Sequence, residues 1–364
     1  MERMQKNGAG LRQGPRPRRV SWWSVSAAVL AAPGAVLLAL RLVPWDIGTP
    51  WIQLLSFFPA ALITTAAGLA AAVVALCIRP GAARSLVAAL AAGVLVAQFS
   101  LVLGRIVPAA GEDNLQSAAL PAGQPAAKAL PRKQTLTVMA VNVGSRGIDA
   151  AALLAEVKSR NVDVLALPEL APQGLEELDI AGLATVLPGR APDVDWAGTG
   201  NALFARFPLE QAERVPGSVF YQSQAVAVVP GVAAPVHLTA VHIDSPLPGH
   251  TRTWRAELRQ LGELWRAAPE GEPTILLGDF NATADHREFR DLLALGLTDA
   301  ARTAGKGLVP TWPVNSPVPA FAALDHVLVS PGIGIAEVEV VTLPGTDHAA
   351  VVARLVLQQK QALP

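Results

Sequence analysis

The chain has 364 residues and a formal net charge of zero, but its charges are unevenly distributed. Residues 1–20 carry six Lys or Arg and one acid, whereas residues 135–364 carry 16 Lys or Arg against 25 Asp or Glu, a net charge of −9. All six histidines lie in this second region. The separation predicts at least two domains in different surroundings. The single cysteine, Cys77, excludes an internal disulfide framework and a cysteine-based zinc site.

Three uncharged segments near the N-terminus are long enough to cross a membrane. They are residues 21–40, 47–78 and 86–104, and a helix of about 20 apolar residues spans a bilayer. The middle segment is too long for one straight crossing, so its spanning part is predicted at residues 54–76. A secretory signal peptide is the alternative for the first segment, but two apolar segments follow it and no clear cleavage site precedes them. We therefore predict a three-helix transmembrane anchor over residues 21–107.

The basic residues predict how this anchor is oriented. The head, residues 1–20, is basic, and positive residues stay in the cytoplasm. Three crossings then place the rest of the chain outside the cytoplasm, so we expect a multi-pass protein of the cell membrane. Because no charged residue interrupts the three segments, nothing marks an ion or proton path, and a plain anchor is the simplest interpretation. Residues 108–134 are rich in Ala, Pro and Gly, which predicts an extended linker.

Strands and helices are predicted to alternate from residue 135 onward. Residues 135–141 form an apolar run typical of a buried strand, and residues 251–267 place their apolar side chains on one face of a helix. This mixture favours a layered α/β fold over an all-α or all-β fold. Further strands are predicted at residues 162–167, 201–204, 224–229, 236–241, 274–277, 324–329, 335–341 and 349–355, and further helices at residues 148–160 and 285–295.

The tetrad Gly278-Asp279-Phe280-Asn281 directly follows the apolar run at residues 275–277. Side chains alternate along a strand, so Asp279 and Asn281 are expected on one face. A carboxylate and a carboxamide at the carboxyl end of a strand suit a hydrated hard cation and a phosphate. The tetrad therefore predicts a metal-assisted site that handles phosphate.

Other polar side chains also stand at predicted strand ends. Asn142, Glu169 and His242 each follow a strand. Each has an ordinary alternative explanation: a turn cap, a surface acid and a hydrogen-bonded core histidine. Acid, amide and imidazole groups that recur at strand ends, where open α/β sheets place their ligands, favour one shared site. The remaining members of this set open the last strands and are Asp325, His326, Asp347 and His348.

Together these residues resemble the endonuclease/exonuclease/phosphatase family of metal-dependent phosphohydrolases. The resemblance covers residues 135–357 and implies a four-layer α/β sandwich (α+β) with two mostly antiparallel central sheets. The three predicted transmembrane helices precede this domain and lie outside the resemblance. The expected divisions are a basic head (1–20), the anchor (21–107), the linker (108–134), the catalytic domain (135–357) and a tail (358–364). The matching motifs, in the family's order, are Val141-Asn142-Val143, Leu167-Pro168-Glu169, Gly200-Asn201-Ala202-Leu203, Val241-His242, the tetrad, Leu324-Asp325-His326-Val327 and Thr346-Asp347-His348.

The resemblance implies a divalent cation, Mg²⁺ or Mn²⁺. Glu169 is expected to be the main metal ligand, with Asn142 and Asp347 in support. Magnesium prefers oxygen ligands and keeps several waters, so one or two carboxylates and an amide are enough. Such an ion neutralises the charge of a phosphodiester and stabilises the charge that grows in the transition state.

The resemblance also implies catalytic roles. His348 is expected to be the general base, with Asp325 orienting its ring. Asp279 would position or activate the attacking water, and it is an alternative base that the sequence does not exclude. Asn281 and His242 are expected to contact the phosphoryl oxygens. The sequence identifies no partner for His242, although Asp244 is close in sequence, and it leaves His326 as either a site residue or a packing neighbour.

The sequence thus predicts a membrane-anchored phosphoesterase, of the endonuclease type, acting outside the cytoplasm. A phospholipid or small-molecule phosphatase of the same fold is the alternative, because a net charge of −9 provides no strong field for nucleic acid and the anchor holds the site near the bilayer. From other classes, a catalytically silent binding module is disfavoured by the complete set of polar residues, and a transport protein by the uncharged spans. No protein partner can be inferred.

Overall fold

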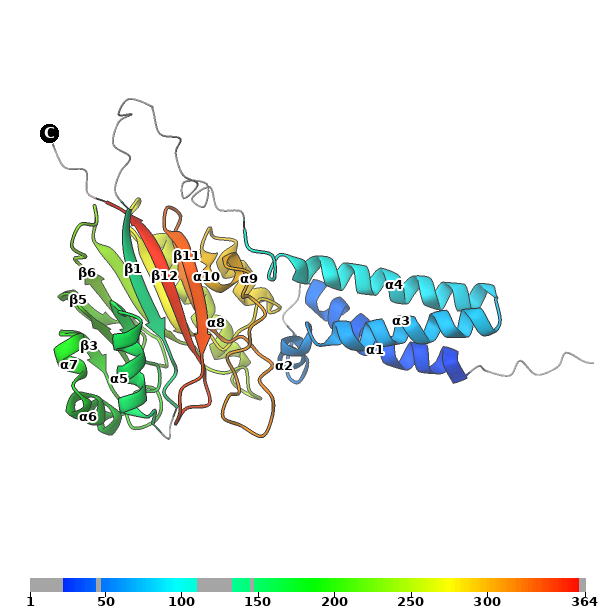
Figure 1. The fold of residues 1–364 in the computed structure, drawn as a ribbon, viewed down its shortest axis with the longest axis horizontal. Helices are drawn as coiled ribbons and strands as arrows, with labels where there is room; N and C mark the ends of the chain where they lie inside the picture. Colours follow the sequence, from blue (N-terminus) through cyan, green and yellow to red (C-terminus); the bar gives the residue numbers. More distant parts are fainter. Residues whose placement is uncertain (1–21, 44–46, 110–132, 145–146, 360–364) are drawn as a thin grey trace, which may run out of the picture.

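The computed structural model describes residues 22–43, 47–109, 133–144 and 147–359. Three long helices project from one side of a layered α/β domain (Figure 1). The predicted basic head, most of the predicted linker and the last five residues of the tail lie outside the described residues.

The projecting helices are α1 (Trp22–Leu42), α3 (Ala61–Ile78) and α4 (Ala82–Leu103). All three are long and apolar enough to cross a membrane. Close packing between α1 and α3 depends on small residues, since a Cβ atom at Gly68 would lie 2.7 Å from the backbone nitrogen of Ala31. Small residues at such contacts are typical of helices that pack within a bilayer.

The middle apolar segment does not form one helix from residue 54 onward, so that predicted start was wrong. Trp51–Leu54 form the short helix α2, Leu55–Phe57 form the 3-10 turn η1, and α3 begins only at Ala61. Ile52 is fully buried in a cluster with Trp254 and Leu276 of the α/β domain. Apolar residues suit a buried protein interface as well as a membrane. Composition alone therefore placed the start of the spanning helix at the wrong residue.

A buried ion cluster joins the helical bundle to the α/β domain. The carboxylate of Asp285 accepts hydrogen bonds from Arg41, at the end of α1 (2.7 Å), and from Arg105, just after α4 (2.5 and 2.7 Å). All three side chains are at least nine-tenths buried. The backbone N–H of Ala109 donates to the carbonyl of Thr303 at 2.9 Å. The bundle is therefore docked on the domain and is not joined to it only through residues 110–132.

Two six-stranded sheets form the centre of the domain, in the orders β11-β12-β1-β2-β4-β3 and β5-β6-β7-β8-β10-β9. Neighbouring strands are antiparallel except for the pairs β1–β2 and β7–β8. The predicted, mostly antiparallel pair of sheets is confirmed. The strands are β1 (Lys133–Ala140), β2 (Val164–Ala166), β3 (Gly189–Asp193), β4 (Asn201–Ala205), β5 (Leu209–Arg214), β6 (Ser223–Ala227), β7 (Val236–His242), β8 (Thr274–Asp279), β9 (Thr298–Asp299), β10 (Asp325–Val329), β11 (Gly334–Val341) and β12 (Ala350–Gln358).

The sheets pack face to face, and helices cover their outer faces, which gives the predicted four layers. Val138 of β1 and Leu277 of β8 belong to the apolar cluster between the sheets. Leu153 of α5 packs in a cluster with Leu165 of β2, and Trp254 of α8 packs over the second sheet. The helices are α5 (Ala150–Ser159), α6 (Pro172–Ala181), α7 (Leu183–Val186), α8 (Thr251–Ala267), α9 (Arg287–Leu293) and α10 (Ala300–Thr303).

Gly278 allows β7 and β8 to approach each other just before Asp279. Its φ is +144°, and a Cβ atom would lie 2.1 Å from the carbonyl oxygen of Val241. Gly278→Ala is therefore expected to lower the free energy of unfolding by about 3 kcal/mol, because strand backbone cannot move aside as a flexible side chain can. Denaturant unfolding of the full chain in detergent measures this loss.

Gly271→Ala is the matched control for this variant. Gly271 has a φ of +80°, but no atom lies within 4 Å of its Cβ position. The control should cost only about 1 kcal/mol, the penalty for a left-handed backbone. Equal losses for the two variants would show that the contact with Val241 does not constrain the sheet.

Candidate active site

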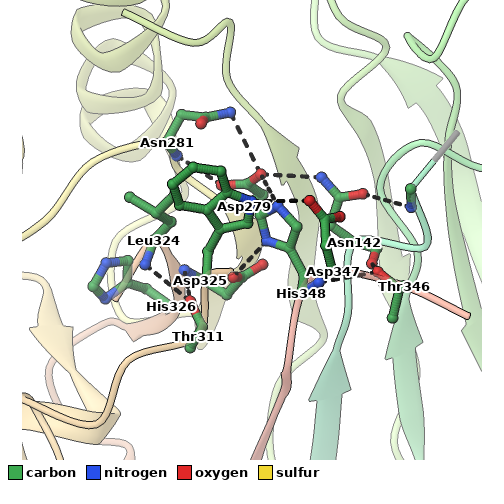
Figure 2. Close-up of polar contacts among 12 residues, drawn as sticks. Asn142, Asp279, Asn281, Thr311, Leu324, Asp325, His326, Thr346, Asp347 and His348 are labelled. Carbon is green, nitrogen blue, oxygen red and sulfur yellow. Dashed lines mark hydrogen bonds and ion pairs between the residues drawn. The ribbon is translucent and has the colours of Figure 1, made fainter. Parts of the chain in front are cut away.

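The polar residues predicted at strand ends meet at one edge of the two sheets. β1, β7 and β8 end at this edge, and β10 and β12 begin there, so residues far apart in the sequence become neighbours (Figure 2). Hydrogen bonds, ion pairs and a shared pocket connect all eight predicted site residues: Asn142, Glu169, His242, Asp279, Asn281, Asp325, Asp347 and His348.

His348 and Asp325 form a buried hydrogen-bonded dyad. The Nδ1 of His348 lies 2.9 Å from Oδ2 of Asp325, and its Nε2 lies 3.8 Å from Oδ2 of Asp279. Because a carboxylate only accepts, Nδ1 carries the donated proton. The hydroxyl of Thr346 accepts the backbone N–H of His348 at 3.1 Å. These contacts fix the imidazole with its Nε2 directed at Asp279.

Asp279 is held by the amides of two asparagines. Its Oδ1 accepts the backbone N–H of Asn281 at 2.8 Å, and its Oδ2 accepts Nδ2 of Asn142 at 3.0 Å. The same Nδ2 donates to Oε1 of Glu169 at 2.9 Å. The Asn142 amide therefore links two carboxylates and holds them close to each other.

Two of these residues have a positive φ, which is unfavourable for Glu but is tolerated by Asn. Glu169 has a φ of +63° and Asn281 a φ of +45°. Non-glycine residues are uncommon in this region, and strained residues concentrate at functional sites. Glu169 lies three residues beyond β2 and Asn281 two residues beyond β8. Glu169 is linked to Asp279 through Asn142, and Asn281 bonds to Asp279 itself. The positive φ angles and the clustered polar side chains therefore both point to a functional site at this position.

The charges of the site interact strongly. Burial raises the pKa of Asp279, and the nearby His348 only partly opposes this. Burial lowers the pKa of His348, but the carboxylates of Asp325 and Asp279 outweigh it and raise that pKa well above its usual range. Burial and the charge of His348 lower the pKa of His242 to about 3. We therefore expect an imidazolium at position 348 and a neutral imidazole at position 242.

The donor set suits a hard divalent cation. Glu169, Asp279, Asp325 and Asp347 place four carboxylates around a single imidazolium, and burial also raises the pKa of Glu169. A cation would compensate this excess of negative charge.

The ligand atoms are not equally available for a metal. Asp279, Asp325 and His348 have donor atoms within 4.8 Å of one another, but Asp325 and His348 already bond to each other. Glu169 is more accessible, with a quarter of its side chain exposed, and Asp347 is exposed. Asn142 presents its Nδ2 to Glu169, so ligation through Oδ1 would require its amide to turn over and release the N–H of Gly144. Glu169 and Asp347 therefore fit a metal best, and Asn142 fits after reorientation.

The structure also places the two histidines that the sequence left open. His242 lies with its Nε2 3.7 Å from Oε1 of Glu169, and its Nδ1 has no hydrogen-bond partner among the described residues. Asp244 pairs with His250 at 3.0 Å and is not the partner of His242. His326 is bonded to Asp299 and does not line the pocket, so it is a packing neighbour.

Several residues of the site were not singled out by the sequence. The Thr346 hydroxyl donates to the carbonyl of Asn142 at 2.7 Å, and the Thr311 hydroxyl accepts the N–H of Asp325 at 3.2 Å (Figure 2). Trp312 donates its indole N–H to Asp347 at 3.0 Å. These residues lie in loops or beside motifs, and Thr and Trp have many structural uses. Only the position of Thr346 beside Asp347 offered a signal.

Comparisons with known proteins identify the family to which the chain belongs. Residues 139–348, more than half of the chain, match the model of the Endonuclease/Exonuclease/phosphatase family. The chain belongs to this family, which makes it a phosphoesterase of the hydrolase class.

Solved structures show the same fold. D. rerio TDP2 complexed with a single-strand DNA product is 18% identical, with a TM-score of 0.51, over 61% of this chain and 98% of that one. An endonuclease/exonuclease/phosphatase from Beutenbergia cavernae is 20% identical, with a TM-score of 0.50, over 64% of this chain and 74% of that one. A search of curated proteins found no match. At these identities the structural likeness shows the fold alone.

Proposed function

We propose that this protein is a membrane-anchored, divalent-metal-dependent phosphoesterase that hydrolyses phosphodiester bonds. The observation that carries the proposal is the dyad of His348 and Asp325 facing Asp279, in a pocket of about 560 Å³ that also exposes Glu169 and Asn281. A binding module would not require a buried imidazolium aligned between two carboxylates.

Glu169 and Asp347 would hold Mg²⁺ or Mn²⁺, with Asn142 in support. When bound, the ion supplies positive charge for the phosphoryl oxygens and lowers the barrier to attack by water. The protein itself holds the carboxylate oxygens of these two ligands in place. The hydrogen bond from Trp312 fixes Asp347, and the turn with a positive φ fixes Glu169.

The sequence favoured His348 as the base and left Asp279 as an alternative, and the charges in the site favour Asp279. Asp279 accepts the proton of the attacking water, since burial raises its pKa toward the range where proton transfer is effective. The water oxygen bonds to phosphorus, the P–O bond to the leaving alcohol breaks, and solvent protonates the leaving oxygen. His348 stabilises negative charge on the phosphoryl oxygens, and His242 offers a further N–H group to them. Nδ2 of Asn281 donates to the carbonyl of Ile243 at 2.8 Å and to Oδ2 of Asp279 at 3.4 Å, so Asn281 would contact these oxygens by giving up the longer bond.

Hydrolysis of methyl p-nitrophenyl phosphate by the full chain tests this function. We expect turnover with Mg²⁺ or Mn²⁺, and loss of turnover with a chelator. Glu169→Gln should weaken metal binding by about tenfold or more, measured by calorimetry, because it removes a charged oxygen ligand. Glu177→Gln, at an exposed position in α6, is the control. Metal affinity unchanged by Glu169→Gln would reject the assigned ligand.

We also propose that the N-terminus is cytoplasmic and that the catalytic domain lies outside the cytoplasm. The basic head and three crossings support this orientation. In sealed right-side-out vesicles, protease added from outside should then reach the catalytic domain. Protection of the domain in such vesicles would reverse the orientation.

A further inference from the structure

The segment between α1 and α3, residues 51–58, forms part of the active-site pocket. Gln53, Ser56 and Phe57 line this pocket together with Glu169 and His348. The segment therefore connects the membrane part of the chain directly to the catalytic groups.

Several contacts hold this segment in place. Gln53 donates its Nε2 to the carbonyl of Pro246 at 2.8 Å, and Nε2 of His286 lies 2.8 Å from the carbonyl oxygen of Ile52. The ring of Phe57 stacks on that of Phe321, with centroids 4.4 Å apart. With Ile52 fully buried, the segment is an ordered wall of the pocket.

The pocket is polar at one end and apolar at the other. An aromatic series leads from Phe57 through Phe321 to Trp312, whose ring centroid lies 6.5 Å from that of His348. Leu247 adds an apolar side chain to the same lining. The described residues that line the pocket include no Lys or Arg. An apolar group would therefore bind beside Phe57, and a phosphate would bind at the catalytic end only where the cation held by Glu169 and Asp347 offsets the carboxylates.

The apolar end lies where the membrane-spanning helices end. The segment lies between α1 and α3 in the chain, and α2 lies between the bundle and the catalytic domain in Figure 1. Trp51 and Phe57 are 48% and 40% exposed, and Leu247 is 52% exposed. Exposed aromatic residues at the end of a membrane span are typical of the membrane–water interface.

We infer that the substrate is a membrane lipid that carries a phosphodiester, bound with its phosphate at the catalytic residues and its hydrocarbon chain against Phe57 and Leu247. The inference rests on the proposed phosphoesterase function. Water adds to phosphorus and one P–O ester bond breaks, which yields a phosphomonoester and an alcohol. Aromatic rings also stack on nucleic-acid bases, but nucleic-acid binding relies on Lys and Arg that contact phosphates, and the pocket lining has none.

A series of methyl, butyl and octyl p-nitrophenyl phosphates tests this inference with the full chain in nanodiscs. We expect kcat/KM to rise by about 30-fold or more from methyl to octyl, because each buried methylene favours binding. In Phe57→Ala the ratio of octyl to methyl kcat/KM should shrink to less than about fivefold. Phe99→Ala, an exposed residue of α4 outside the pocket, should keep the full rise. Partitioning into the nanodisc is the same for every variant.

Leu247→Ala provides a second variant. Because Leu247 is exposed, we expect this variant to fold normally. It should also reduce the rise. A flat series in the native chain, or a rise that both variants retain, would overturn the inference. So would a single-stranded oligonucleotide hydrolysed with a higher kcat/KM than the octyl ester, which would indicate a nucleic-acid substrate. If the methyl ester is not hydrolysed with either metal, the proposed function itself fails.

Discussion

Asp279→Asn is expected to lower kcat for phosphodiester hydrolysis by about 10³-fold, the range usual for loss of a general base. The substitution keeps the size of the side chain but removes the charge that accepts a proton from water. Its Oδ1 can still accept the N–H of Asn281, so the tetrad should keep its shape. Steady-state hydrolysis of methyl p-nitrophenyl phosphate measures the effect, and thermal unfolding shows whether the fold is retained.

Asp244→Asn is the matched control for Asp279→Asn. Asp244 is also buried, and it lies two residues beyond the end of β7, the strand beside β8. It bonds to His250, and neither residue lines the pocket. It should lose less than about threefold in kcat, because it takes no part in proton transfer. A drop for Asp279→Asn no larger than that of the control would remove Asp279 from the mechanism. His348, as the sequence first suggested, would then be the remaining candidate for the base.

Much of the catalytic domain was predictable because its signals are local. α8 has the predicted bounds, residues 251–267, since one strongly amphipathic face defines it. The strands at the site were predicted because polar residues interrupt buried apolar runs. β3 and β5 were missed, because β3 contains Gly189 and Pro192 and β5 is largely exposed. Neither strand has the apolar alternation that sequence analysis depends on.

The site itself was predictable in its members but not in its contacts. Each residue was found at a strand end, yet nothing in the sequence indicates that Asn142 links Glu169 to Asp279 or that Asp244 pairs with His250. Such contacts depend on register between strands distant in the chain. The docking of residues 51–58 on the catalytic domain was hidden for the same reason, since its apolar side chains suit a bilayer equally well.

Asp285→Ala is expected to lower the free energy of unfolding by about 3–5 kcal/mol, the usual cost of removing one partner of a buried ion pair. Burial raises the pKa of Asp285, but Arg105 and Arg41 outweigh it and hold that pKa below its usual range, so the group is ionised. Without this carboxylate, the buried guanidinium groups of Arg41 and Arg105 would face each other. Unfolding of the full chain in detergent, followed by limited proteolysis, measures the loss.

Asp291→Ala is the control for Asp285→Ala. Asp291 lies on α9, with 64% of its side chain exposed, and pairs with Arg287 one helical turn away. Exposed pairs of this kind contribute about 0.5 kcal/mol. If the two variants lose similar stability, the ion cluster does not hold the bundle on the catalytic domain.

An apolar replacement of the whole cluster separates its stabilising role from its positioning role. The triple variant Arg41→Met, Arg105→Met, Asp285→Leu removes the three buried charges together, and such replacements are often neutral or stabilising. Asp285 lies only four residues beyond Asn281, and Arg290 donates to the carbonyls of both Asp285 and Arg41. We therefore expect the triple variant to recover stability but to have a lower kcat than the native chain, because the cluster sets where the loop after the tetrad sits. Recovery of both stability and kcat would mean that the membrane bundle only anchors the enzyme and does not shape its active site.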